Sequence, residues 1–492
     1  MAEGLLLLNN RLWPMFCLYL LAGMGNVSSV ISTFAKNEFT LSSLDQYFMG
    51  GISTVVMGIA SLFAGVLLNK WSHTKNGYNE QKGRLRLTNL GLISAILAFL
   101  LPVFAGLNGD LGEALLWKKN LLMGTFALLG LSGAFLDVST KPTLMAVSKK
   151  GDYQERVFGL SIFKQVFGNL ANYVVPPIIM GIMLAFGAEK LCDWTIVFPV
   201  YAAASIAITF LYNAFKMKEQ TLADEDEIGK ESTLSLFSML KEMKGKTKYH
   251  KLLRHGLVAT IFHGANMSIF GLFVNTLMMN HFPEYNAEAM YEVAESSNAL
   301  SQFFAPIVNS WLGVSLLTFT APIIVGRIMG TKMLKSKKID RGTLLKISAA
   351  TVSLGILLIN SPVWALQVAG VVILALGLTN ISPVITGYTT DNTRHKSDVV
   401  SALLSGSTFL SFLLSTLFGS SLDWCTKMPW IPFVLPLAMT LYLWYFGSVI
   451  SSKKFEGNNE NTTTPAAENT ETNPQTEDEP KAMPDMNNPL PN

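Results

Sequence analysis

Charged residues are scarce in this chain of 492 residues, making up only 14% of it. A soluble domain usually carries about 25% charged residues, and here the charges cluster and leave long stretches almost free of them. This scarcity excludes an ordinary soluble domain. Many of the uncharged stretches reach the roughly 20 apolar residues that a helix needs to cross a bilayer. The sequence therefore predicts an all-α membrane protein.

Cysteines are almost as rare. The three that occur, Cys17, Cys192 and Cys425, form no CxxC pair and no metal-ligand spacing. We therefore expect neither a metal nor a cofactor. Cys192 and Cys425 fall in two loops on the same predicted face. A disulfide between them is therefore possible in an oxidising compartment. No nucleophile–base pair and no phosphate-binding loop is present, and we expect neither an enzyme nor a nucleic-acid partner.

Twelve apolar spans are predicted, the first of which begins after Arg11 and is expected to stay in place rather than act as a cleaved signal peptide. The predicted spans are 12–32, 46–69, 86–106, 120–140, 157–186, 194–215, 253–280, 298–327, 344–360, 362–387, 399–419 and 430–451.

Lysine and arginine alternate between the loops in a regular way. They crowd the loops after the second, fourth and eighth spans and the central stretch, whereas the opposite loops hold only Lys36, Lys118, Lys119, Lys190 and Lys427. Cytoplasmic loops of membrane proteins carry the excess of lysine and arginine. Both termini are therefore predicted to be cytoplasmic, in a multi-pass protein of the inner membrane.

The spans divide into two six-helix, pseudo-symmetric halves, residues 1–215 and 253–451. Residues 216–252 form a polar cytoplasmic linker whose second part has helical apolar spacing; this amphipathic helix lies either on the membrane surface or under the bundle. Residues 452–492 are rich in Asn, Thr, Pro and Glu, which predicts a disordered acidic cytoplasmic tail. Parallel repeats of this kind place a solute site between the halves.

One carboxylate lies deep inside a span, and it is the most informative residue. Burial would raise the pKa of Asp137 and suit it to carry a proton. Lys141, one helical turn later, and Lys164, in the next span, could instead hold it charged in a structural or gating ion pair. A direct contact between Asp137 and the solute is the third reading.

Neutral polar residues inside the spans are the candidates for solute contact. Gln165, Asn169 and Asn172 share one face of the fifth span with Ser161, and an amide both donates and accepts hydrogen bonds, which suits a solute bearing hydroxyl groups. The other candidates are Asn26, His263, Asn266, Gln302 and Asn380. For all of them the other reading is a hydrogen bond between helices.

Four stretches resemble the fucose permease-like branch of the major facilitator superfamily. They are Phe39-Thr40-Leu41-Ser42 with Gly50-Gly51, the run from Leu136 through Asp137 to Pro142, Gly326-Arg327-Ile328-Met329-Gly330-Thr331, and the segment from Asn380 through Pro383 to Ser405-Gly406. The resemblance spans roughly residues 12–450. It implies the major facilitator fold, alternating access and proton-coupled sugar uptake, with Asp137 as a coupling residue and Asn69, Lys70 and Arg327 at the cytoplasmic gate.

Two positions depart from the family pattern. The first span runs Gly25-Asn26-Val27-Ser28-Ser29 without the usual second acid, and Asn69 stands where an acid is usual. The lysines near Asp137 would suit an anionic solute. We therefore predict a secondary transporter of a small polar solute, first a sugar or sugar-like metabolite, with protons as the implied coupling ion and a monomer as the expected state. The alternatives are a transporter of an anionic solute such as a sugar acid and a non-transporting membrane sensor.

Overall fold

The structure of this chain is a computed structural model. It describes residues 13–24, 27–39, 41–74, 77–78, 80–105, 115–147, 175, 178–179, 194–214, 248–281, 311–336, 338–392 and 407–452. All of them belong to the first of two units, Met1–Phe455; the second unit, Glu456–Asn492, lies outside the described residues.

The first half of the chain forms long apolar helices. They are α2 (Trp13–Met24), α3 (Ser28–Glu38), α4 (Ser43–Ser72), α5 (Glu80–Ala105), α6 (Leu115–Val147), a short 3-10 turn η4 (Trp194–Ile196) and α9 (Val197–Ala214). Helix α6 packs against α4 and α5, and α9 packs against α2 and α5. A two-stranded antiparallel hairpin, β1 (His73–Thr74) with β2 (Gly77–Tyr78), joins α4 to α5. The prediction of an all-α chain did not include this hairpin.

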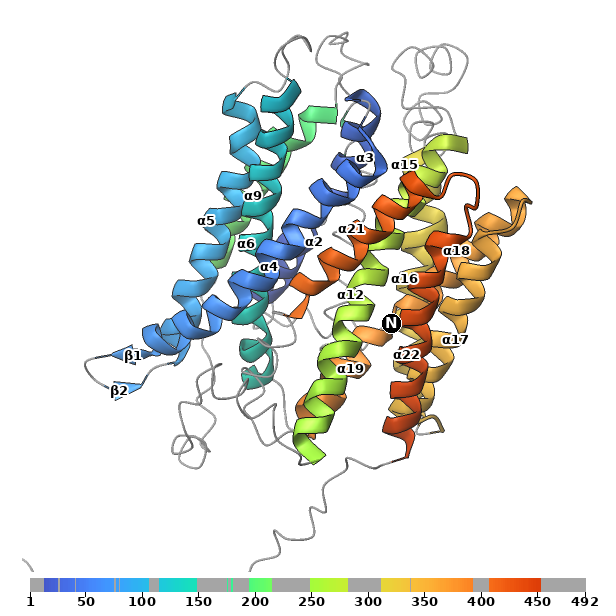
Figure 1. Cartoon of the computed structure of the whole chain (residues 1–492). Helices are drawn as coiled ribbons and strands as arrows, with labels where there is room; N and C mark the ends of the chain where they lie inside the picture. The colour runs from blue at the N-terminus through green and yellow to red at the C-terminus, as the bar shows by residue number, and fades with distance from the viewer. Residues whose placement is uncertain are drawn as a thin grey trace, which may run out of the picture. The chain divides into compact units, whose positions relative to one another are not determined.

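The second half has a similar set of helices. They are α12 (Lys248–His281), α15 (Trp311–Ser315), the π-helix η5 (Leu316–Thr320), α16 (Ala321–Lys335), α17 (Arg341–Ile359), α18 (Trp364–Leu378), α19 (Ile381–Asp391), α21 (Phe409–Trp424), the 3-10 turn η6 (Ile431–Phe433) and α22 (Val434–Ser451). Helix α17 packs against α18 and α22, and α12 packs against α21 and α22. Figure 1 shows α21 running beside α4 of the first half, and the two helices are in extensive contact.

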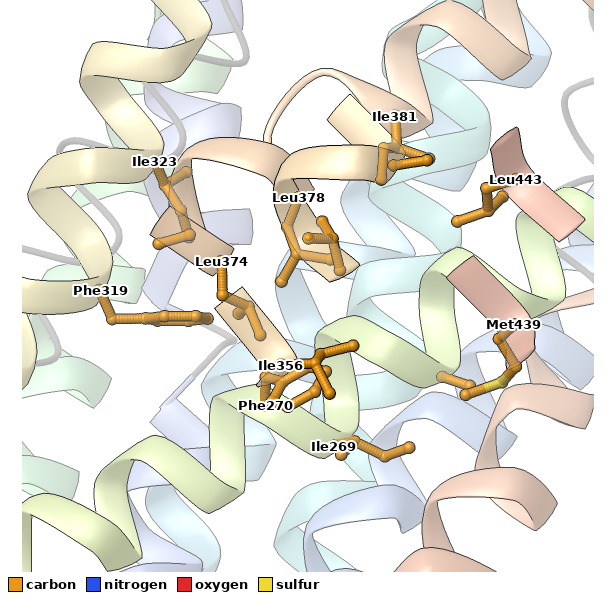
Figure 2. Packing of buried hydrophobic residues seen from close by; sticks show 14 of the residues in the cluster. Ile269, Phe270, Phe319, Ile323, Ile356, Leu374, Leu378, Ile381, Met439 and Leu443 are labelled. Carbon is orange, nitrogen blue, oxygen red and sulfur yellow. The ribbon is translucent and has the colours of Figure 1, made fainter. Parts of the chain in front are cut away.

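Each half has its own core. One cluster of buried apolar side chains draws on α2 to α6 and α9, and another draws on α12 to α22. Figure 2 shows Phe270 of α12 beside Ile356 of α17, with Leu374 of α18 close by. Val30 and Tyr47 come from the first half but belong to the second cluster. These two residues mark where the halves meet.

Nine helical stretches in the described part of the chain are long and apolar enough to cross a membrane. They correspond to all the predicted spans except the first, the fifth and the eleventh. The first span is described as α2 and α3 without Gly25 and Asn26, and the eleventh is described from Ser407; most of the fifth lies outside the described residues. A multi-pass helical membrane protein is confirmed, and the count of twelve stays a prediction.

Two predicted spans are interrupted rather than continuous. The eighth contains the π-helix η5 directly before Pro322, and the tenth divides into α18 and α19 at Thr379 and Asn380, shortly before Pro383. Proline has no backbone N–H to give to the carbonyl four residues earlier. The interruptions therefore lie where the helical hydrogen-bond ladder loses a donor.

Glycine lets α6 approach α4 very closely. A Cβ added at Gly130 would collide with the backbone carbonyl of Ser53, whereas one added at Gly124 of the same helix would lie 3.6 Å from Leu101 Cδ2. Gly130 lies seven residues before Asp137 on α6. The close approach therefore holds α6, the helix that carries Asp137, against α4.

Asp340 caps the N-terminus of α17, and all its partners belong to the second half. Its carboxylate accepts hydrogen bonds from the backbone N–H groups of Gly342 and Thr343, at 3.2 and 3.3 Å, and from Ser451 Oγ at 2.9 Å. Partial burial raises the pKa of Asp340, but these hydrogen bonds outweigh burial and hold the pKa below its ordinary value. The stabilisation is therefore complete at neutral pH and is lost as the pH falls through the lowered pKa.

We expect Gly130→Ala to lower the free energy of unfolding by about 1–3 kcal/mol, the usual cost of overpacking. The measurement is the thermal unfolding of each purified variant in detergent. Gly124→Ala is the matched control on the same helix, and it should unfold at or slightly above the temperature of the parent, because alanine favours a helix more than glycine does. Equal unfolding temperatures for the two variants would contradict the close approach.

Candidate functional site

Asp137 lies on the last third of α6, and its side chain is half-buried. Thr88 Oγ1 of α5 donates to Ser139 Oγ at 2.9 Å, two residues beyond Asp137, and so joins α5 to this part of α6. The backbone of Lys141 continues α6 for one more turn, but its side chain lies outside the described residues, as does all of Lys164. The choice between a proton carrier, an ion pair and a solute contact is therefore still open.

The predicted amide face of the fifth span cannot be placed. Six predicted residues lie outside the described ones in full, and the side chains of two more, Asn69 and Lys141, do so as well. The six are Asn26, Lys164, Gln165, Asn169, Asn172 and Gln302. Their roles stay predictions.

His263 and Arg327 lie close together in the second half. His263 is on α12 and is 9% exposed, Arg327 is on α16 and is 6% exposed, and the charge of Arg327 acts on the imidazole. His263 Nδ1 has no hydrogen-bond partner. The structure thus gathers two predicted residues, one assigned to the solute and one to the gate, within a single half.

Asn380 connects the interruption of the tenth span to α16. Its Nδ2 donates to the backbone carbonyl of Gly326 at 3.0 Å, and Thr379 Oγ1 donates to that of Ile323 at 3.2 Å. A Cβ at Gly330 would collide with the Asn380 side chain. Gly330 therefore leaves room for Asn380, and Gly326 leaves room for Leu376 and Thr379. The contact of Asn380 is the one expected of a helix–helix residue.

Asn266 makes a similar contact in a different direction. It is fully buried on α12, and its Nδ2 donates to Thr440 Oγ1 of α22 at 3.2 Å. His263 lies one turn earlier on α12, and the charge of Arg327 of α16 acts on it. Lys70 is separate from both: it is exposed on the last turn of α4, next to the hairpin.

One apolar cavity of about 280 Å³ lies between α4 and α6. It is lined by Val56, Ile59, Ala60, Phe63, Leu131 and Phe135. Phe135 is only two residues from Asp137, but all six side chains are apolar and several are partly exposed. Such a cavity offers no hydrogen bonds to a polar solute, and we do not assign the solute site to it.

The halves meet in a group of contacts that we call the outer seal. It is formed by Ser43, Leu44, Gln46, Tyr47, Thr276, Ile269, Gly419 and Asp423. Gln46 Nε2 donates to Thr276 Oγ1 of α12 at 3.1 Å, and Tyr47 Oη donates to the carbonyl of Ile269 at 3.2 Å. Phe34 of α3 also lies against Trp311 of α15, with ring centroids 5.1 Å apart.

These contacts join the halves at one end, the end predicted to face away from the cytoplasm. Gln46 and Tyr47 were missed by the sequence reasoning, although a glutamine in an apolar span is a signal of the kind that identified Asn266. Asp423 was missed because its partners are backbone N–H groups of a helix 380 residues away in sequence, and no sequence pattern predicts that contact.

Comparison with known proteins agrees with this architecture. The model of the Major Facilitator Superfamily matches residues 12–416. Crystal structures of the E. coli fucose:proton symporter FucP, in a single-residue variant, and of FucP in the outward conformation are similar in fold, with TM-scores of 0.55 and 0.56. Each is 12% identical, over 88% of this chain and 98% of theirs. A search of curated proteins finds no match.

The prediction of a transporter rather than an enzyme is thereby confirmed, as is the predicted fold. At 12% identity the likeness to FucP shows the fold alone. The match to the family model covers most of the chain, both halves included, and this chain belongs to the Major Facilitator Superfamily.

Proposed function

We propose that this chain moves a small neutral polar solute of the sugar type across the inner membrane by alternating access, with Asp137 as its coupling or gating group. Members of the superfamily carry small solutes, and a similar fold is that of a fucose:proton symporter. The observation that carries the proposal is a half-buried carboxylate inside a membrane-crossing helix. Intramembrane acids are costly and mark ion and substrate pathways.

The solute contacts in this proposal come from both halves. The amides of the fifth span, Gln165, Asn169 and Asn172, would face the path with Asn26 from the first half, and His263 would face it from the second. A neutral solute rich in hydroxyl groups matches donors and acceptors of this type. Lys70 and Arg327 are proposed to act at the cytoplasmic gate, with both termini on that side.

The anionic alternative has one specific observation in its favour. Arg327 is only 6% exposed, so the second half buries one cationic side chain at membrane depth. Lys141 and Lys164 would add to this charge from the first half. A sugar acid would then be preferred over the neutral sugar, and competition between the two solutes distinguishes the readings.

We expect Asp137→Asn to abolish uptake driven by a pH gradient while solute exchange stays measurable, because the amide keeps the shape of the side chain and cannot release a proton. The measurement is uptake of labelled fucose, other neutral sugars and sugar acids into proteoliposomes. Accumulation that survives unchanged would remove Asp137 from the proton path. Binding without flux for every solute would favour the sensor reading.

Lys141→Ala and Lys164→Ala test the ion-pair reading of Asp137. If either lysine holds the carboxylate charged, its loss makes the carboxylate easier to protonate and moves the pH dependence of transport toward higher pH. The pH profile of exchange is the measurement. Unchanged profiles in both variants would leave the ion-pair reading without support.

Asn266→Ala decides between solute contact and helix packing for this residue. The hydrogen bond to Thr440 predicts a loss of about 1 kcal/mol in the free energy of unfolding, and Thr440→Ala should produce a similar loss that is not additive in the double variant. The measurement is thermal unfolding with and without solute. Additive losses, together with a solute-dependent shift that Asn266→Ala alone removes, would support solute contact instead.

A further inference from the structure

The first turn of α4 completes its hydrogen bonds with a residue of the other half. The side chain of Ser42 accepts from the N–H of Asp45 at 3.0 Å, as an N-cap residue does. The N–H groups of Ser43 and Leu44 remain, and they donate to Asp423 Oδ1 and Oδ2 at 3.2 and 2.9 Å. Each oxygen of the carboxylate thus accepts one backbone N–H at the start of α4.

The position of Asp423 makes this contact more than local packing. It is the second-last residue of α21, where the carbonyl ends of its own helix repel a negative charge. The N-terminus of α4 attracts the same charge. Lys36 of α3 adds to the attraction, because its charge acts on Asp423 while its Nζ donates to Ser43 Oγ at 3.3 Å. Asp423 is therefore better placed with the halves together than apart.

Deeper in the outer seal the contacting side chains are buried. Gln46 and Tyr47 are at most 1% exposed, and a Cβ at Gly419 of α21 would lie 2.8 Å from the Tyr47 side chain. The hydrogen bonds of Gln46 and Tyr47 can be replaced by water only after the halves move apart. Asp423 stands in exposed surroundings above them, so it is the first of these contacts that water reaches.

We propose that Asp423 is a latch between the halves: its carboxylate caps α4 and holds the outer seal closed, and the cap must leave before this end of the transport path can open. The latch rests on alternating access but on no particular solute or coupling ion. Asp423→Asn keeps the shape and one acceptor, but it loses the charge and places an amide NH₂ against a backbone donor. The closed state loses stability, and the state open at this end becomes more populated.

Distances between spin labels on the two halves measure this equilibrium. Asn120 at the start of α6 and Asn280 at the end of α12 are exposed, and the bonds of neighbouring residues place both near the start of α4. Each is replaced by cysteine in full-length protein, purified in detergent without added solute. The native cysteines are replaced by alanine: Cys17, Cys192 and Cys425.

We expect Asp423→Asn to raise the ratio of the population with separated spin labels to the population with close spin labels about tenfold. This corresponds to the loss of about one charge-assisted hydrogen bond. Asp340→Asn is the matched control, because Asp340 also accepts two backbone N–H groups at a helix start but stays within one half. It should lower the unfolding temperature without changing the distances. No change for Asp423→Asn, or an equal change for both variants, would overturn the latch.

A second variant changes the donor side of the same contact, on α4. Ser43→Pro removes one of the two N–H groups from which Asp423 accepts, leaving that of Leu44, and proline is well tolerated at the first position of a helix. The ratio should rise in this variant too, and adding Asp423→Asn should then raise it by less than it does alone. A full, additive effect of Asp423→Asn in the Ser43→Pro background would show that the carboxylate acts elsewhere. Because the readout needs no transported solute, failure of the proposed function leaves this test intact.

Discussion

The constraint on which this structure depends is that backbone N–H and C=O groups inside a bilayer must find partners within the protein, since hydrocarbon offers none. A continuous helix such as α12 meets it within its own length. Where the tenth span divides, its side chains bond a neighbouring helix: Asn380 Nδ2 and Thr379 Oγ1 donate to backbone carbonyls of α16. At the membrane edge the first turn of α4 meets it through Asp423. Tertiary contacts thus arise where helices are incomplete.

The same constraint explains what the sequence could predict. Apolar length and the alternation of lysine and arginine follow directly from the bilayer, so the helical class and most spans could be read without a structure. The interruptions at Leu316–Thr320 and Asn380 could not, because a proline inside an apolar span only weakens a helix and its neighbours decide whether it breaks. The hairpin after α4 gave no signal either, since each of its strands has two residues.

The candidate site was predictable in part for a related reason. A polar residue in an apolar span is visible in sequence, but its direction is not. Asn266 of α12 turns toward α22, where it donates to Thr440, whereas His263, one turn earlier, is under the influence of the Arg327 charge on α16. The residue type is the same for a solute ligand and for a helix–helix bond, and only the neighbouring helix distinguishes them. Asp423 could not be identified from the sequence, because its partners are backbone groups of a distant helix.

The π-helix at Leu316–Thr320 has a consequence for every residue that follows it. A π turn inserts one residue into a helix, and each residue of an α-helix advances by about 100°. The insertion therefore sets the rotational phase of α16, which turns Arg327 inward and its neighbour Ile328, 41% exposed, outward. With one residue fewer, an apolar side chain would take the inward place of the guanidinium. The one-residue insertion thus decides whether α16 turns a cationic or an apolar side chain toward the interior of the second half.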